Sequence, residues 1–200
     1  MTPNKKKSVA VIDGPNNFHC AKFLDFKIDS RKLLAFINSR WDCRQVHYYS
    51  PATERTEAML KAFGQNGYDI VSREQHIIKG DDGSERTINP NLLVDMICDT
   101  FDELYADEDI EHVVIFGGNG EMLRFVQSLN AMNIGVTIVS SVGRVLSRKL
   151  ETYISSTGGR NSLIDLRTLR DQLELGNGGL SLVSDYNKSS DQGHCHPVQP

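Results

Sequence analysis

The sequence predicts an α/β domain, a three-layer sandwich whose mostly parallel sheet of five or six strands lies between two layers of helices. Short apolar runs such as residues 9–12 are continuous rather than alternating, which is typical of strands buried on both faces of a parallel sheet. Segments with helical periodicity separate these runs along most of the chain. The length of 200 residues fits one domain with short extensions.

Strands and helices are expected to alternate from the N-terminus onward. Strands are expected at residues 9–12, 45–49, 68–72, 111–116 and 136–140, with residues 75–78 as a candidate extension of the sheet edge. Helices are expected at residues 30–40, 53–65, 91–105, 121–132 and 145–155, with a candidate further helix at 162–175. Asp29 or Ser30 is the expected cap of the first helix, and Asn89 with Pro90 the expected start of the third. Residues 79–89 are expected to form a polar loop.

Composition divides the chain into three parts and excludes several classes of protein. Residues 1–7 are expected to be a flexible leader, residues 8–175 the folded domain and residues 176–200 a flexible tail rich in small and polar residues. Four cysteines far apart argue against a zinc ribbon or a disulfide framework, and favour a cytoplasmic location. No apolar run is long enough to span a membrane, so no membrane partner is expected. A net charge of −4 argues against a strongly basic nucleic-acid-binding protein, but it allows a local basic patch.

Two strand ends carry residues that suit a binding site. Asp13 ends the first apolar run and is followed by Gly-Pro-Asn-Asn, so its carboxylate and the amides are candidate oxygen ligands for a divalent cation. The alternative is an ordinary turn, since these are common turn residues. The sequence GGNGE at residues 117–121 follows the fourth strand. It would let backbone approach a phosphate at a helix N-terminus, or would simply form a tight strand-to-helix turn.

Charged residues elsewhere have both a functional and a structural interpretation. Asp95, Asp99 and Asp102 share one face of the third helix, opposite Leu93, Ile97 and Leu104, and we expect that face to be solvated. Arg144 opens a basic stretch that continues through Arg148, Lys149 and Arg160. This stretch is either a solvated helix face or a contact for a phosphate backbone.

Residues 9–166 resemble the NYN domain, a member of the PIN-like nuclease superfamily, and most closely its LabA-like branch. The resemblance depends on the motif AVIDGPNN at residues 10–17 and on the segment from Val113 to Val139. It implies a sheet with strand order 3-2-1-4-5, which would put Asp13 beside the turn at residues 117–121. The sheet edges would then lie near Ile70 and Val136, and exposed edges favour pairing, so a homodimer is expected.

The resemblance also implies a metal-dependent endoribonuclease site in which clustered acids hold Mg²⁺ or Mn²⁺. Asp13 matches the first acid of the family motif, Asn16 its companion amide, and Asp95 the acid within the helix. These matches make Asp13 and Asp95 candidate catalytic residues and Asn16 a candidate binding residue. Arg144 is a candidate binding residue for RNA.

At two other positions this chain departs from the family pattern. Asn89 stands where the family has an acid after the polar loop, and Asn119 where it has an acid after the fourth strand. Glu121 replaces the second acid of that turn, which leaves Asp13 and Glu121 as the expected metal ligands and Glu121 as a third candidate catalytic residue. Asn89, Gly118 and Asn119 are expected to line the binding site. The acidic site is therefore degenerate.

Three functions remain open from the sequence. The chain is a metal-dependent ribonuclease with weak or no cleavage, or an inactive relative that binds RNA or a nucleotide in the same groove. It is otherwise a regulatory protein that uses the fold for protein interactions. RNA is the expected partner in the first two cases.

Overall fold

A six-stranded parallel sheet forms the middle layer of the computed structural model, which describes residues 5–79, 85–88 and 91–176. The strand order is β3-β2-β1-β6-β7-β8, and every pair of neighbours in it is parallel. The strands are β1 (Lys7–Asp13), β2 (Asp42–Ala52), β3 (Asp69–Glu74), β6 (His112–Phe116), β7 (Gly135–Ser140) and β8 (Ser162–Asp165). The expected order of the first five strands is confirmed, and β8 adds a sixth beside β7.

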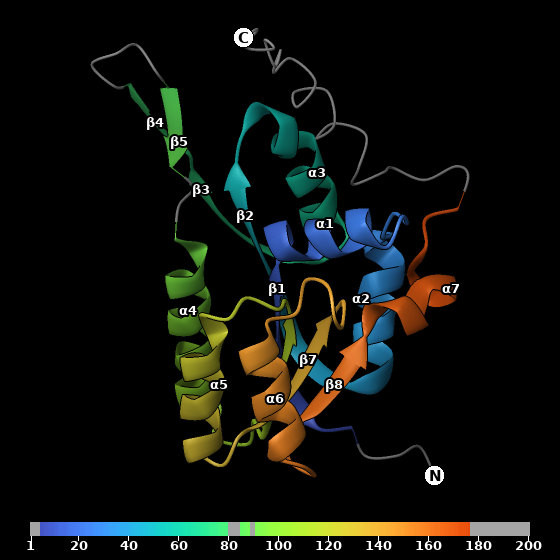
Figure 1. The fold of residues 1–200 in the computed structure, drawn as a ribbon, viewed down its shortest axis with the longest axis vertical. Coiled ribbons are helices and arrows are strands. Elements are labelled where there is room, and N and C mark those ends of the chain that lie inside the picture. Colours follow the sequence, from blue (N-terminus) through green and yellow to red (C-terminus); the bar gives the residue numbers. More distant parts are fainter. Residues whose placement is uncertain (1–4, 80–84, 89–90, 177–200) are drawn as a thin grey trace, which may run out of the picture.

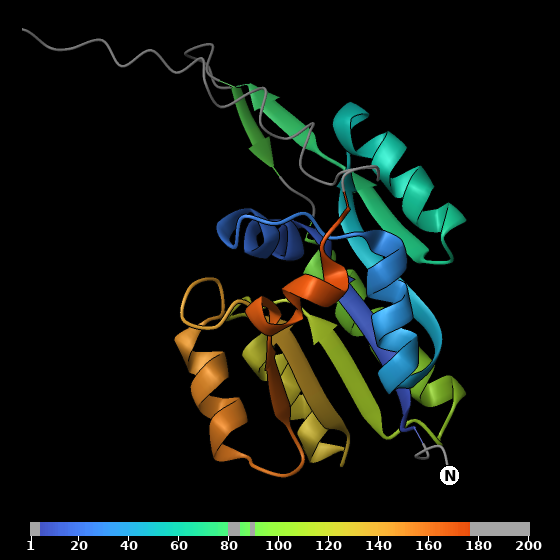
Figure 2. The same ribbon diagram turned by 90° about the vertical axis from the view of Figure 1, so that its right-hand side faces the viewer.

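Helices cover both faces of the sheet, as Figures 1 and 2 show from two sides. One layer contains α1 (Gly14–Phe23), α2 (Ser30–Arg40), α3 (Glu54–Gln65) and α7 (Arg170–Leu173). The other contains α4 (Leu92–Ala106), α5 (Met122–Ala131) and α6 (Arg148–Ser156). Helix α1 crosses the edge of the sheet where the strands end at their carboxyl ends, which we call the carboxyl edge. None of the helices in the described ranges is long and apolar enough to cross a membrane.

The central strand β1 shows why the sequence forms a sandwich with two cores. Val9 and Val11 pack into the core under α4, α5 and α6, whereas Ala10 and Ile12 pack into the core under α1, α2 and α3. All four side chains are buried. A strand covered on both faces needs apolar residues at consecutive positions, which is the pattern that predicted it.

Several expected boundaries differ from the observed ones. The candidate helix at 162–175 is instead β8, a 3-10 helix (Leu166–Leu169) and the short helix α7, because Leu163 and Ile164 extend the sheet and the Asp165 carboxylate caps the turn by accepting from the backbone N–H of Arg167. Val136 is therefore not at a sheet edge, since β8 pairs with β7. The helix expected from residue 145 begins at Arg148. Residues 1–4 and 177–200, from the expected leader and tail, lie outside the described residues.

The structure contains two elements that the sequence did not predict, β5 and α1. The expected loop at 79–89 includes β5 (Glu85–Ile88), which pairs antiparallel with β4 (His76–Lys79) as a hairpin. Helix α1 starts directly after Asp13 with Gly-Pro-Asn-Asn, residue types that favour turns, yet proline also suits the first turn of a helix. The expected cap Asn89 and Pro90 lie outside the described residues, and the observed N-cap of α4 is Asn91.

We predict that one buried histidine makes the fold sensitive to acid. His112 is 4% exposed. Burial, together with the nearby charge of Lys6, lowers its pKa from 6.5 to about 4. In the unfolded chain His112 binds a proton near pH 6.5, whereas in the folded chain it binds one only near pH 4. The contribution of neutral His112 to the free energy of unfolding is therefore fully present above pH 6.5 and is lost as the pH falls towards 4. Over this window the loss should reach about 3 kcal/mol, at roughly 1.4 kcal/mol per pH unit.

Urea unfolding of wild type and His112→Gln from pH 7 to pH 4 would measure this loss. The variant should show a smaller loss of unfolding free energy than the wild type, while His76→Gln, which changes an exposed histidine, should leave the pH dependence unchanged. Equal pH dependence in wild type and His112→Gln would contradict the prediction.

Candidate functional site

Parallel pairing of β1 with β6 brings Asp13 beside the glycine-rich turn. Ile12 pairs with Phe116, so both strands end at the same level of the sheet. A Cβ atom added to Gly117 would lie 3.3 Å from Asp13 Cβ and 2.9 Å from Met122 Cε. Gly117 thus allows a close approach between the two strand ends. The expected juxtaposition of Asp13 with this turn is confirmed.

Asp13 caps helix α1 as well as ending β1. Its carboxylate Oδ1 accepts the backbone N–H of Asn16 at 3.1 Å, which satisfies one of the free donors of the first helical turn. Burial raises the pKa of Asp13, and this is partly opposed by the hydrogen bond from the Asn16 N–H and by the nearby His19. The side chain of Asn16 lies near Cys20, with Oδ1 3.8 Å from Sγ. Asp13 is therefore a half-buried carboxylate that already has a structural partner.

The turn after β6 is held by close packing and by its own side chains. A Cβ on Gly118 would lie 2.5 Å from Ser140 Oγ, and the Gly118 carbonyl accepts the backbone N–H of Ser147 at 2.8 Å. Two hydrogen bonds connect Asn119 and Glu121. Asn119 Oδ1 accepts the backbone N–H of Glu121 at 3.1 Å, and Asn119 Nδ2 donates to the side-chain Oε2 of Glu121 at 3.4 Å. These contacts are those of a tight strand-to-helix turn.

Two of the three aspartates on α4, Asp95 and Asp99, contact side chains of the sheet, which corrects in part the expected solvated face. Tyr49, the partner of Asp13 on β2, donates its hydroxyl to Asp99 Oδ2 at 3.0 Å. Arg73, on β3, donates from Nη2 to Asp95 Oδ1 at 2.6 Å and from Nε to Asp95 Oδ2. Asp95 is only 16% exposed at its side chain, whereas Asp102 is exposed. The expectation was wrong for Asp95 and Asp99 because α4 lies across β1, β2 and β3, so this flank of the helix meets polar side chains of the sheet.

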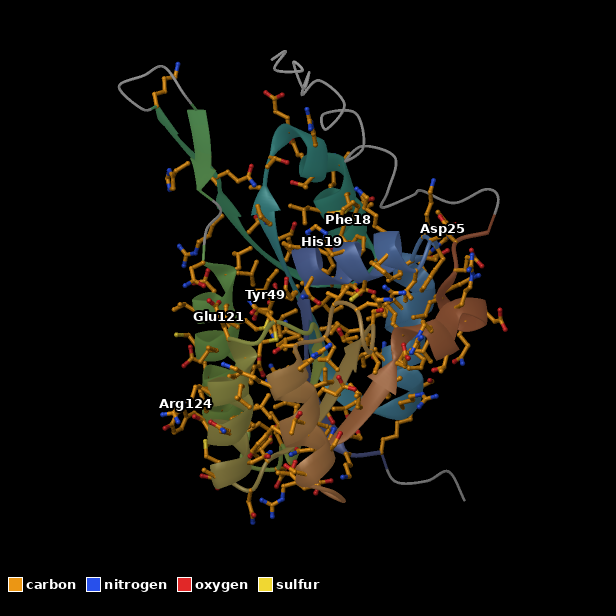
Figure 3. The ribbon with its side chains drawn as sticks, viewed as in Figure 1. Phe18, His19, Asp25, Tyr49, Glu121 and Arg124 are labelled. Atoms are coloured by element: carbon orange, nitrogen blue, oxygen red, sulfur yellow. The ribbon has the colours of Figure 1, made fainter. Side chains whose placement is uncertain are left out.

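Sequence reasoning did not find Tyr49 and Arg73. Tyr49 is 1% exposed and belongs to the core on the α4 side, and burial together with Asp99 raises its pKa. Arg73 holds the pKa of Asp95 below its usual value. Figure 3 shows Tyr49 near the upper end of the sheet, below the helix that carries His19. The only signal in the sequence was a polar-tipped residue near the carboxyl end of each expected strand.

Arg144 lies in the turn after β7, at the same carboxyl edge. Its guanidinium carbon is 4.9 Å from the centroid of the Phe23 ring, at the end of α1. Phe23 is 50% exposed, so the arginine and the ring form one exposed cationic and aromatic surface. Asn89, the remaining candidate binding residue, lies outside the described residues.

The described residues do not assemble a complete metal site. Among them, no three His, Cys, Asp or Glu side chains converge in a geometry that could hold an ion. Asp95 is paired with Arg73, and Asp13 caps α1. The side chains present fit at most a site in which Mg²⁺ or Mn²⁺ keeps several water ligands.

We predict that Arg73 controls the ionisation of Asp95. Replacing Arg73 with Gln removes the opposite charge that favours the carboxylate, so the pKa of Asp95 should rise in the variant. NMR titration of the Asp95 side-chain carboxyl carbon would measure the shift. The matched control is Arg167→Gln, which removes the guanidinium paired with Asp165 on β8 and should leave Asp95 unchanged. An unchanged Asp95 titration in Arg73→Gln would contradict the assignment.

Comparison with known proteins agrees with this geometry. Residues 8–157 match the family model of the NYN domain. The low amplitude and bright protein LabA of Synechococcus elongatus is 24% identical over 170 residues, covering 82% of this chain and 85% of LabA. A protein of unknown function from Vibrio parahaemolyticus, VPA0982, shares the fold with a TM-score of 0.62 at 17% identity, over 88% of this chain and 99% of that one. The chain belongs to the NYN domain family of PIN-like proteins.

Proposed function

We propose that this protein binds RNA at the carboxyl edge of its sheet and cleaves it weakly or not at all. The observation that carries the proposal is the state of the acids at that edge. Asp13 occupies the position of the family's first acid, but Asn119 replaces another and Asp95 is paired with Arg73. The protein would then use the family's binding surface with a weakened catalytic centre.

Divalent metal ions are the usual cofactors of NYN and PIN-like nucleases. In this chain Asp13 and Glu121 are the residues proposed to hold Mg²⁺ or Mn²⁺, with Asp95 as a further catalytic acid. A bound ion would supply an activated water for attack on a phosphodiester. Each asparagine keeps a carbonyl oxygen but lacks the charge of aspartate. Two missing charges, at Asn89 and Asn119, weaken metal binding by several kcal/mol as an order of magnitude at intermediate dielectric.

The surface formed by Arg144 and Phe23 supports RNA as the ligand. A guanidinium suits a phosphate contact, and an exposed aromatic ring suits stacking of an unpaired base. Asn16, Asn89, Gly118 and Asn119 are the other residues proposed to contact RNA. The protein is proposed to act in the cytoplasm, and pairing of two copies through the edge strand β3 stays a prediction.

We predict that RNA binding is independent of metal and depends on Arg144. A labelled single-stranded oligonucleotide should bind in the presence of EDTA. Arg144→Gln should weaken binding and reduce the slope of log K against log salt by about 0.7, because one phosphate contact to a single strand is lost. Fluorescence anisotropy at several salt concentrations measures both quantities.

Arg124→Gln is the matched control, since Arg124 is exposed on α5 (Figure 3) and lies outside the proposed surface. Loss of RNA binding in EDTA, or an equal effect of the two variants, would contradict the prediction. Failure to bind RNA under any of these conditions would leave a protein-interaction role as the better explanation of the fold.

We predict that restoring the two acids restores cleavage. Asn89→Asp with Asn119→Asp should raise the affinity for Mn²⁺, because it adds two negative charges to the site, and should switch on cleavage of single-stranded RNA. Mn²⁺ binding by calorimetry and cleavage of a labelled RNA measure the two effects separately. Asp13→Asn in the restored background should abolish cleavage.

Two outcomes would contradict this proposal in opposite directions. Efficient cleavage by the wild type that is lost in Asp13→Asn would show that the reduced acid set is sufficient. A restored variant that binds no metal would show that residues 89 and 119 do not belong to the site.

A further inference from the structure

A groove lies at the edge of the sheet where the strands begin, opposite the carboxyl edge. It has a volume of about 560 Å³, within the range of small-molecule sites. Its walls come from the chain before β1, the end of α2 and the starts of β6, β7 and β8. We call it the basic groove. Its key lining residues are Lys5, Lys6, Arg40, Trp41, His112 and Arg160.

The basic groove has a one-sided charge. Lys5, Lys6, Arg40 and Arg160 line it, and no Asp or Glu is among its lining residues in the described part of the chain. The whole protein has a formal net charge of −4, so four cations without a lining carboxylate are a local departure from the average. Cations gathered in a cleft attract and retain anions.

Neutral groups hold three of these four cations in place. Lys5 Nζ donates to the carbonyl oxygen of Asn38 at 2.6 Å, and Arg160 Nη1 donates to that of Asn130 at 3.1 Å. The guanidinium of Arg40 lies 4.7 Å from the centroid of the Phe36 ring. These contacts orient the side chains without neutralising them, so their charge is available to a ligand.

A buried floor completes the groove. Trp41 is 8% exposed and packs edge-on against Phe36, with ring centroids 6.0 Å apart. His112 is buried; its Nε2 lies 2.8 Å from Thr137 Oγ1, and its Nδ1 has no hydrogen-bond partner. The charge of Lys6 reaches this ring, since it contributes to the lowered pKa of His112. The cationic side chains therefore surround a floor formed by the buried residues Trp41 and His112.

We infer that the basic groove binds a small molecule that carries two or more phosphate groups. Two guanidinium groups and two ammonium groups match the charge of a diphosphate, and the planar fork of arginine pairs with two phosphate oxygens at once. The site is separate from the proposed RNA surface. The seven residues of β1, from Lys7 to Asp13, lie between the two edges, a span of about 20 Å at the rise of a strand.

Trp41 makes the inference directly testable because it is the single tryptophan of the chain. Wild-type protein is titrated with inorganic pyrophosphate at low ionic strength while tryptophan fluorescence is followed. A saturable change is expected. Lys6→Gln and Arg160→Gln should each weaken binding at least about tenfold, since each removes one charge–phosphate interaction. Arg124→Gln makes the same change of charge on α5 and should bind as wild type does.

A parallel titration with ADP distinguishes a nucleotide from a free diphosphate. Tighter binding of ADP than of pyrophosphate assigns the groove to a nucleotide, and equal affinity assigns it to the diphosphate alone; both outcomes support the inference. No fluorescence change at millimolar pyrophosphate, or the same weakening in all three variants, overturns it. A response to single-stranded RNA but not to pyrophosphate or ADP also overturns it, and leaves the test of Arg144 unaffected.

Discussion

The parallel pairing of β1 with β6 is the interaction on which the arrangement of this protein depends. In the order β3-β2-β1-β6-β7-β8, the strands that follow β1 in the sequence, β2 and β3, lie on one side of it. The strands that follow β6, which are β7 and β8, lie on the other side. The connections on the two sides place α1, α2 and α3 on one face, and α4, α5 and α6 on the other. Open parallel sheets bind ligands at such a reversal, because the loops leaving the two central strands diverge. Gly117 fits this geometry, since a Cβ atom there would lie 3.3 Å from Asp13 Cβ and would require the end of the Met122 side chain to shift.

The layers of the fold could be read from the sequence because they follow from local chemistry. The buried strands correspond to continuous apolar runs in the sequence, and Thr53, the N-cap of α3, is a residue type that favours the start of a helix. Helix α1 could not be read in this way. Its first residues favour turns in isolation, and the Asp13 carboxylate and the packing of Cys20 and Ala21 into the core stabilise them as a helix.

The candidate site was predictable in its position but not in its contacts. Asp13 and the glycine-rich turn follow from strand order alone. The pairing of Arg73 with Asp95 joins an edge strand to a helix that follows the hairpin, a long-range contact without a local signal. A helical wheel assigned Asp95 and Asp99 to solvent because it counts charges as outward-facing. The wheel contains no information about the sheet, where the Tyr49 hydroxyl and the Arg73 guanidinium bind these carboxylates.

The cap at the start of α1 links ligand binding at Asp13 to the stability of this helix. The Asp13 carboxylate satisfies the backbone N–H of Asn16, and α1 ends at Phe23, where the ring meets Arg144. A ligand that binds Asp13 Oδ1 would compete with the Asn16 N–H for the same oxygen atom. Binding at that atom would therefore weaken the cap of α1, and the ten residues of this helix connect the acid to the aromatic ring at its other end. Ligand affinity at Asp13 and the order of this helix are two measures of one equilibrium.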